Sequence, residues 1–334
     1  MPSAELVTAT PTVADPADTG AGSRPARAEF HLFLPQMRLS LEALVERARA
    51  AEAAGFAGMA LMDHLRPPKA EDQTMFEAVV TATWLAAHTE RLVIGHLVLC
   101  DAFRHPAVLA RQAVTLDHAS GGRFELAVGS GSTPDELEVF GFGAPPTSAR
   151  IARLRETLEV VTRLWSGEPV TFEGQFHRLR GARQLPTPTR PIPIVIGGTG
   201  PTTMGVVADF ADWWNVPAHQ ASRLDELRPL AGAARVSLQQ LVTLSAAGAT
   251  RREVVELAER RFGWMGAQGR ALGSGPELVV HFDALRRRGV ERFYVWFTDF
   301  APPDTLRAFG AEVIDPLGQR AAGVGRRPLG AGAE

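Results

Sequence analysis

The run PIPIVIGGTGPTTM combines residue types that suit the binding of a phosphate group. Its apolar half predicts a strand over 192–196, and its second half predicts the start of a helix. Free backbone N–H groups and the positive end of that helix would converge on Gly197, Gly198, Thr199 and Gly200. The alternative is a purely structural role, in which these glycines only make a tight turn. Their place late in the chain favours phosphate binding if the strand belongs to a barrel, because barrels often bind phosphate on their later loops.

An aspartate-histidine pair, Asp63-His64, follows another apolar run. A histidine at that position could hydrogen-bond a cofactor ring or transfer a proton. The alternative is a structural histidine held by the neighbouring aspartate. Metal binding is disfavoured because no second histidine stands at helical i, i+4 spacing from His64. His96 and His105 are weaker candidates of the same kind.

The segment FELAVGSGSTPDELEVFGF contains small residues, Ser130, Gly131 and Ser132, that would let a flat ligand approach the backbone. Two carboxylates, Asp135 and Glu136, follow. Glu136 is a candidate site residue, and the alternative is that both acids only stabilise the N-terminus of a helix.

Motifs of several other enzyme classes are missing from the sequence. Neither the P-loop pattern nor the dinucleotide-binding pattern is present, since the first predicted strand is followed by PQMRLS. No Gly-x-Ser-x-Gly elbow occurs, and Cys100 lacks a local nucleophile signature. The sequence supplies positioned donors but few strong acids, bases or nucleophiles. It therefore indicates an enzyme whose cofactor carries the reaction.

The elements that must position these residues alternate, with short apolar runs followed by longer helical patterns, which is typical of parallel βαβ units. The number of expected strands is eight, as a closed α/β barrel of the (β/α)₈ type requires. The expected strands are 30–35, 58–63, 92–99, 124–129, 192–196, 212–217, 236–246 and 292–299. Helices are expected between the Ser40 cap and Gly55, and at 75–88, 105–118, 148–165, 202–210, 250–262, 276–288 and 303–313.

One stretch, 166–191, interrupts the alternation. Its pattern around Glu173-Gly174 predicts a hairpin inserted between the fourth and fifth strands. In a barrel, chemistry belongs at the carboxyl ends of the strands. Those ends hold Asp63-His64, Cys100-Asp101, 129–132, 197–200, Asn215 and Thr298-Asp299. The pair Trp213-Trp214 lies on one strand, so its two side chains should face opposite sides.

Composition limits the class of protein. The chain has 334 residues, 45% hydrophobic and 22% charged, with 35 basic and 37 acidic side chains and a formal net charge of -2. This balance gives no reason to expect a nucleic-acid partner. No apolar run approaches the roughly 20 residues that span a bilayer, so no membrane association is expected. A lone cysteine cannot form an internal disulfide, which fits a reducing, cytoplasmic location.

The two ends differ in composition from the rest of the chain. Residues 1–28 are rich in Ala, Pro, Thr and Gly and predict a disordered leader, and residues 318–334 predict a flexible tail. A single barrel domain is expected over 29–317.

Taken together, several segments resemble the luciferase-like monooxygenase superfamily of flavin-dependent enzymes. They are FHLFLP, MALMDHL, TERLVIGHLVL, RHPAVLARQAVTLDHASGGRFELAVGSGS, LWSGEPVTFEGQFHRL and PIPIVIGGTGPTTMGVVADFADWWN. They occur in order from about residue 30 to 217, with a looser match at 273–297. The resemblance implies a (β/α)₈ barrel that binds reduced FMN or the deazaflavin coenzyme F420, and it implies a homodimer.

The resemblance also implies roles for individual residues. The cofactor phosphate would lie on Gly197, Gly198, Thr199 and Gly200, and the ring would lie beside Asp63 and His64. Further cofactor contacts would come from His96, Val98, Cys100, Ser130, Gly131 and Ser132. Many relatives carry an aromatic residue after the fourth strand where this chain has GSGSTPDEL, although Glu136 and the following FGF match the family spacing. The substrate pocket is therefore the part of this chain to which the resemblance applies least.

The leading hypothesis is an F420-dependent oxidoreductase that transfers hydride to or from a small organic substrate, with Asp63, His64 and Glu136 as catalytic candidates. The alternative is a monooxygenase that uses reduced FMN and O₂. A separate flavin or F420 reductase would be the partner that supplies the reduced cofactor. A flavin-binding protein without turnover is a third hypothesis. A cofactor-free barrel lyase or isomerase is a fourth, and the lack of a well-placed barrel lysine counts against it.

Overall fold

Eight strand positions form a ring in the computed structural model, which describes residues 28–245, 250–263 and 269–322. The strands of the ring are β1 (Glu29–Phe33), β2 (Gly58–Leu61), β3 (Val93–His96) continued by β4 (Leu99–Cys100), β5 (Leu126–Gly129), β8 (Ile194–Gly197), β9 (Trp213–Pro217), β10 (Arg235–Leu244) and β12 (Val290–Phe297). They pair in parallel in the order β3-β2-β1-β12-β10-β9-β8-β5-β4. A bridge between Ile94 and Phe124 links β3 to the start of the β5 segment. The predicted (β/α)₈ barrel is confirmed.

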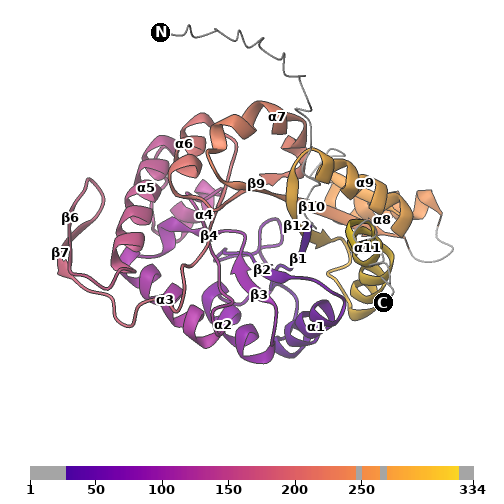
Figure 1. Cartoon of the computed structure of the whole chain (residues 1–334), viewed down its shortest axis with the longest axis horizontal. Coiled ribbons are helices and arrows are strands. Elements are labelled where there is room, and N and C mark those ends of the chain that lie inside the picture. Colours follow the sequence, from indigo (N-terminus) through magenta and orange to yellow (C-terminus); the bar gives the residue numbers. More distant parts are fainter. Residues whose placement is uncertain (1–27, 246–249, 264–268, 323–334) are drawn as a thin grey trace, which may run out of the picture.

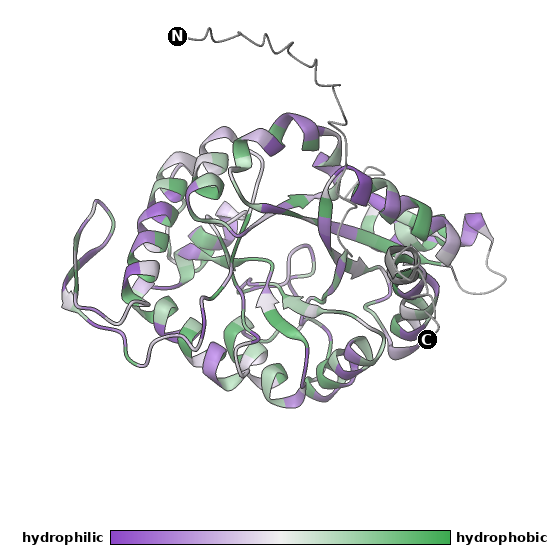
Figure 2. Cartoon of the chain, in the orientation of Figure 1, coloured by the Kyte–Doolittle hydropathy of each residue, from purple (hydrophilic) through white to green (hydrophobic). Residues whose placement is uncertain are grey.

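Helices cover the outside of the ring, as Figure 1 shows. They include α1 (Leu41–Ala53), α2 (Ala78–His88), α3 (Pro106–Ala119), α5 (Thr147–Leu164), α6 (Pro201–Phe210), α8 (Arg251–Phe262), α9 (Gly275–Arg287) and α10 (Pro303–Phe309). The predicted cap of α1 is present, since the Ser40 hydroxyl accepts a hydrogen bond from the Ala43 amide at 3.2 Å. The outer helices carry both hydrophobic and hydrophilic residues, as expected of helices packed on a sheet (Figure 2).

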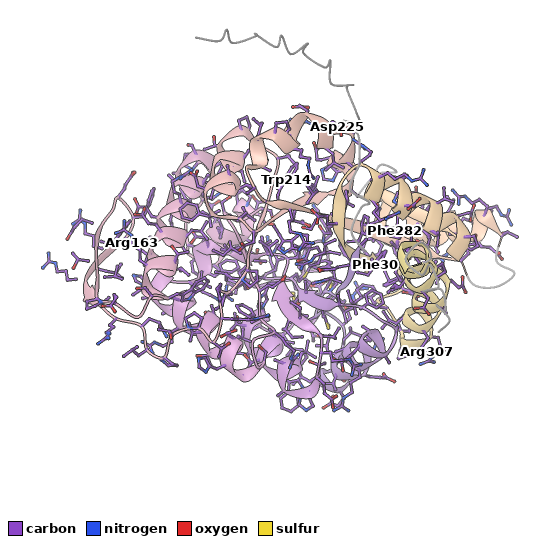
Figure 3. The ribbon with its side chains drawn as sticks, viewed as in Figure 1. Phe30, Arg163, Trp214, Asp225, Phe282 and Arg307 are labelled. Atoms are coloured by element: carbon purple, nitrogen blue, oxygen red, sulfur yellow. The ribbon has the colours of Figure 1, made fainter. Side chains whose placement is uncertain are left out.

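The main core lies between the strands and the helices. Phe30 on β1 contacts Phe282 on α9, with ring centroids 5.2 Å apart, and Phe293 on β12 at 5.4 Å. Figure 3 places Phe30, Phe282 and Trp214 inside the molecule and Arg307 at its outside. This core holds the outer face of the strands against the helices. The interior of the barrel is filled by a different set of side chains.

Several elements differ from the predictions. The expected strand 92–99 is two strands, and the peptide bond between Leu97 and Val98, which lie between them, is cis. Strand β11 (Arg270–Gly273) was not predicted, nor were the short helices η2 (Ala218–Arg223), α7 (Leu224–Leu227) and η3 (Arg228–Ala231). Helix α4 (Pro134–Val139) was missing from the expected helices, although the alternative interpretation of Asp135 and Glu136 placed a helix start there, and both acids do lie in its first turn. Strand β10 pairs with β9 only along its first half, so its second half is free to pair with β11.

The carboxyl-terminal helix continues further than predicted. After α10, a π-helical turn η5 (Gly310–Ile314) leads into α11 (Asp315–Ala322), so residues 318–322 are helical rather than part of a tail. Gly318 suggested an end there, but buried Ile314 and Leu317 hold this turn against the core. Residues 1–27 and 323–334 lie outside the described residues.

The predicted insertion is confirmed as a hairpin of β6 (Val170–Glu173) and β7 (Arg178–Ala182), which pair antiparallel. It extends from the barrel beside α5, where Arg163 lies 5.6 Å from the ring centre of Phe172 (Figures 1 and 3). The hairpin therefore packs on the outer helices.

Side chains inside the barrel are distributed unevenly. On β1, β2 and β12 the interior carries Phe33, Met62 and Trp296 near the carboxyl ends of the strands. On β5 and β8 the matching positions are Gly129 and Gly197, because they alternate with the interior residues Ala127 and Val195. A barrel interior is normally filled by branched side chains. Space is therefore left above β5 and β8, at the carboxyl end.

Candidate active site

A cavity of two lobes opens at the carboxyl ends of the strands. The smaller lobe has a volume of about 300 Å³ and the larger lobe about 840 Å³. Both volumes lie in the range typical of small-molecule sites. The residues that line both lobes are His64, Leu97, Ser132, Thr133, Glu136 and Gln239. A ligand in one lobe would thus contact a ligand in the other at this junction.

The smaller lobe brings together most of the residues predicted from the sequence. Those that line it are Asp63, His64, Val98, Cys100, Ser130, Gly131, Ser132, Glu136, Gly197 and Gly198. They come from the ends of β2, β4, β5 and β8 and from α4. Their convergence follows from the barrel, which places the carboxyl ends of all its strands on one face.

Two predicted phosphate ligands lie just outside this lobe. Thr199 and Gly200 do not line it, and Gly200 is instead the N-cap of α6, with Pro201 in the first turn. The first amides of a helix have no partners within the helix. Gly198 has φ of 131°, and a Cβ there would lie 2.8 Å from Cγ2 of Thr203. Glycine is therefore required at Gly198 to bring the chain close to the helix N-terminus.

His96 is placed differently from the prediction. It lines neither lobe, is 1% exposed, and lies beside the ring of Phe124 at 6.3 Å in the barrel wall. Burial lowers its pKa to about 4, so the imidazole is neutral. His105 is also outside both lobes, and its Nδ1 accepts a hydrogen bond from the Ala107 amide at the start of α3. Both histidines belong to the framework.

His64 is held by Glu136 and not by its neighbour Asp63. Nδ1 of His64 lies 2.8 Å from Oε2 of Glu136, while Oε1 accepts hydrogen bonds from the amides of Leu65 at 2.6 Å and Arg66 at 3.1 Å. Glu136 is 3% exposed. An ionised carboxylate can only accept, so Nδ1 is the donor in this contact, and in the neutral imidazole Nε2 then keeps a lone pair. This arrangement suits Nε2 to accept a proton.

Asp63 serves the framework of the site. Its carboxylate accepts hydrogen bonds from the amide of Cys100 at 2.7 Å and from two nitrogens of Arg104 at 2.6 and 3.0 Å. Arg104 also contacts Glu77 at 2.6 Å. The bidentate pair ties the loop after β2 to the segment after β4, and this fixes the residue that follows Asp63 in the chain, His64.

The wall of the smaller lobe is close-packed, and its one thiol, that of Cys100, is unreactive. Burial raises the pKa of the Cys100 thiol to about 11, so it stays protonated and is no nucleophile. A Cβ on Gly129 would lie 2.7 Å from Cγ2 of Val98, and one on Gly131 would lie 3.1 Å from the Cys100 sulfur. Side chains at these two glycines would therefore displace the wall.

The two tryptophans of β9 face opposite sides, as predicted, and neither lines a lobe. Trp213 points into the barrel, where its ring lies 3.8 Å from the guanidinium of Arg292. Trp214 packs in the outer core and donates from Nε1 to the carbonyl of Gly198 at 2.8 Å. Trp214 thereby supports the glycine turn from behind.

Sequence reasoning missed Gln239 and nearly all of the larger lobe. Gln239 lies in the middle of β10 and lines both lobes, and the only signal was a Gln-Gln pair within a mainly apolar strand. The larger lobe is lined mainly by side chains from scattered loops and helix ends. Those without a sequence signal include Arg38, Arg66, Lys69, Arg260, Arg261 and Phe300.

An α/β barrel with such a cavity at its carboxyl face defines a small-molecule enzyme, and comparison with known proteins identifies its family. Residues 12–262 match the family model described as luciferase-like monooxygenase. The chain belongs to this family, as its motifs indicated, and is an oxidoreductase of the luciferase-like class.

Individual relatives carry one recurring name. The chain is 33% identical over 280 residues to a protein named F420-dependent glucose-6-phosphate dehydrogenase from Nakamurella multipartita, covering 82% of this chain and 72% of that protein. A protein of the same name from Kineococcus radiotolerans is 37% identical over 159 residues. That second match spans about half of each protein, 47% of both.

Solved structures support the fold. An F420-dependent secondary alcohol dehydrogenase, solved with an F420-acetone adduct, superimposes with a TM-score of 0.76 at 19% identity, covering 87% of this chain and 99% of that one.

Within the described ranges, no three histidine, cysteine or acidic residues are grouped as a metal site would need. None of the helices described is both long enough and apolar enough to cross a bilayer.

Proposed function

We propose that this chain is an F420-dependent oxidoreductase that moves a hydride between the deazaflavin and a small organic substrate. The observation that carries the proposal is the smaller lobe, where a glycine turn at a helix start and a carboxylate-held histidine face one cavity. The names of relatives at 33% and 37% identity favour F420 as the cofactor. When bound, F420 supplies two-electron hydride chemistry without oxygen.

The residues of the smaller lobe fit such a group. Gly197 and Gly198 present backbone without side chains, and the unpaired amides at the start of α6 attract a phosphate. A Cβ on Gly197 would meet nothing closer than 3.9 Å, so this glycine is needed for the cavity and not for packing. Val98, Leu97 and Leu99 add an apolar surface for a flat ring.

His64 is the proton-transferring group of the proposed site. Its side chain is 18% exposed and lines both lobes, so it can reach groups bound in either. Because Nδ1 is engaged by Glu136, Nε2 would take the proton from a substrate hydroxyl as hydride leaves, or return it in the reverse direction. Asp63 would act by fixing the loop, and Glu136 by orienting the imidazole.

The test is a fluorescence titration of the whole protein with F420 and, without oxygen, with reduced FMN. We expect F420 to bind with a Kd below about 100 μM, a free energy near -5.5 kcal/mol. Gly197→Val should weaken this binding at least tenfold, since a side chain there enters the lobe. Gly205→Ala on α6, where a Cβ meets no atom closer than 3.7 Å, is the matched control.

The outcomes separate the competing hypotheses. If only reduced FMN binds, and substrate oxidation then consumes O₂, the protein is a monooxygenase as the family description suggests. Binding of F420 without turnover for any substrate indicates a flavin carrier. If neither cofactor binds, the proposed function is wrong and a cofactor-free barrel enzyme is favoured.

We further propose a cytoplasmic homodimer that associates through α2. The free thiol of Cys100 fits a reducing compartment. Val80 and Trp84 lie one turn apart on α2 and are 71% and 44% exposed, which forms an apolar stripe that a second copy could cover. Val80→Glu should shift the sedimentation coefficient to that of a monomer, whereas Val280→Glu, at a valine 67% exposed on α9, should not. A monomeric unmodified protein contradicts this proposal.

A further inference from the structure

The larger lobe is electropositive although the protein as a whole is not. Its lining includes five basic side chains and three acidic ones, in a chain whose formal net charge is -2. Two of the acids are already engaged: Glu71 lies 3.5 Å from Arg66, and Glu136 holds His64. The positive charge is thus concentrated where a substrate would enter.

Three of the cations are available to a ligand. Among the described residues, none forms an ion pair or hydrogen bond with the side chain of Arg38, Lys69 or Arg260. Arg261 is different, because it donates to the Thr298 carbonyl at 2.7 Å. The three side chains come from the loops after β1 and β2 and from α8. They converge on this lobe from segments far apart in the sequence.

The backbone is strained around the same lobe. In the described part of the chain four residues other than glycine have positive φ, and three of them line the larger lobe: Arg38 at 60°, Lys69 at 59° and Phe300 at 63°. The fourth, Ala301, follows Phe300 directly. Such conformations are costly for residues with a Cβ and cluster at ligand-binding sites. Two of the three available cations, Arg38 and Lys69, therefore have strained backbone conformations at the larger lobe.

The rest of the lobe is aromatic. Trp296 lies 5.4 Å from the ring of Phe33 and 4.9 Å from that of Phe262, and two methionines extend this wall. The uncharged polar side chains with a hydroxyl or amide are Ser132, Thr133 and Gln239. All three also line the smaller lobe. A hexose, whose hydroxyls each need partners, would find few along the aromatic wall.

We infer that the larger lobe selects an organic anion with an apolar or aromatic body, in preference to a sugar phosphate. The reacting carbon would lie at the junction by His64 and Gln239, the body against Trp296 and its neighbours, and a carboxylate or similar anion at Arg38, Lys69 and Arg260. The placement of the reacting carbon at the junction depends on the proposed function. The preference of the lobe for an organic anion does not depend on it.

The experiment measures binding of three probes to the whole protein by calorimetry, with and without F420. The probes are 3-phenylpropanoate, its neutral amide 3-phenylpropanamide, and glucose 6-phosphate. We expect the carboxylate to bind at least tenfold more tightly than the amide and more tightly than the sugar phosphate. The double variant Lys69→Gln/Arg260→Gln should abolish the difference between acid and amide. Arg252→Gln, also on α8 but outside the lobe, should preserve it.

Three other results overturn the inference. Equal binding of acid and amide, or no binding of either, shows that the lobe does not select organic anions. Tighter binding of glucose 6-phosphate shows a sugar-phosphate site instead. A preference that survives in the double variant shows that the anion lies elsewhere. Failure of F420 to bind, with the preference for the acid intact, removes the proposed function but leaves the inferred ligand class.

Discussion

The barrel holds a histidine beside a glutamate at each of its two ends, and only one of these pairs can reach a ligand. At the amino end, Nε2 of His31 lies 3.6 Å from Glu29, and His31 is 2% exposed. At the carboxyl end, Nδ1 of His64 lies 2.8 Å from Glu136, and the His64 side chain is 18% exposed in a cavity. The same residue types are structural in one place and suited to chemistry in the other.

The amino end is sealed by a charged network. Arg292 contacts Glu29 at 2.7 Å and Glu125 at 2.6 Å, and its guanidinium lies 3.8 Å from the ring centre of Trp213. Gly58 packs so closely that a Cβ there would lie 2.5 Å from the His31 ring. Burial, together with the charge of Arg292, lowers the pKa of His31 and keeps it neutral.

The difference between the ends lies in the residues that face inward. At the sealed end Trp213 and Arg292 fill the interior, whereas at the open end Gly129 and Gly197 leave it empty. A histidine can exchange a proton with a substrate only where the substrate has room to approach. The interior glycines therefore mark the functional end of this barrel as clearly as the histidine does.

Removing the central cation of the sealed end should have the largest effect on stability. Arg292→Met leaves the buried Glu125 and the partly exposed Glu29 without their partner, so we expect the free energy of unfolding to fall by about 3–5 kcal/mol, mainly through Glu125. Urea denaturation measures this loss. Arg252→Met, which removes an exposed contact 3.6 Å from Glu256, should cost below about 1 kcal/mol. A similar small cost for Arg292→Met would mean that the network does not seal this end.

The buried histidines should make stability depend on pH. The pKa values of His31 and His96 are lowered, the latter to about 4, so between pH 6.5 and 4 the unfolded chain binds more protons than the folded one. The free energy of unfolding must therefore fall as pH drops through this range, by roughly 3 kcal/mol from His96 alone. Denaturation at pH 7, 6 and 5 measures the slope, and His96→Gln should reduce it. A flat profile would contradict the assignment of both histidines as neutral.

The open end was largely predictable, because its residues stand where apolar runs stop. Ser130 and Gly131 follow β5, Gly197 ends β8 and Gly198 follows it, and the carboxyl ends of barrel strands lie on one face. His96 was misplaced because the strand over 92–99 was expected to be unbroken. The chain is instead interrupted at 97–98, and His96 lies in the wall, outside both lobes.

The remaining misses concern contacts between distant segments. The sequence placed Asp63 beside His64, but the partner of His64 is Glu136, 72 positions away, and Asp63 is engaged by Arg104. Positive φ at Arg38 and Lys69 has no sequence signal, because glycine and asparagine are the residues that normally mark it. The larger lobe therefore could not be predicted from composition or spacing.

At the open end, His64→Gln should lower kcat for hydride transfer by about 10²-fold, equivalent to about 2.7 kcal/mol, because the variant cannot transfer the proton. Stability should change by less than about 1 kcal/mol, in contrast to Arg292→Met, because His64 is partly exposed. Stopped-flow reduction of F420 with a substrate anion measures the rate, and His88→Gln, outside both lobes, is the control. An unchanged rate with intact F420 binding would show that His64 only contacts the ring.

The smallest effect is expected for Glu136→Gln, which tests whether Glu136 orients the His64 ring or only supports the loop at Leu65 and Arg66. Glu136→Gln keeps an oxygen for the amides of Leu65 and Arg66 but offers His64 a donor in place of an acceptor, which reverses the tautomer. We expect kcat to fall about tenfold, as is usual when the partner of a functional histidine is lost, with KM and stability nearly unchanged. Glu138→Gln on the same helix, outside both lobes, should leave kcat alone. If KM rises while kcat is retained, Glu136 acts by holding the loop, and the two histidine-glutamate pairs of the barrel are more alike than their exposure suggests.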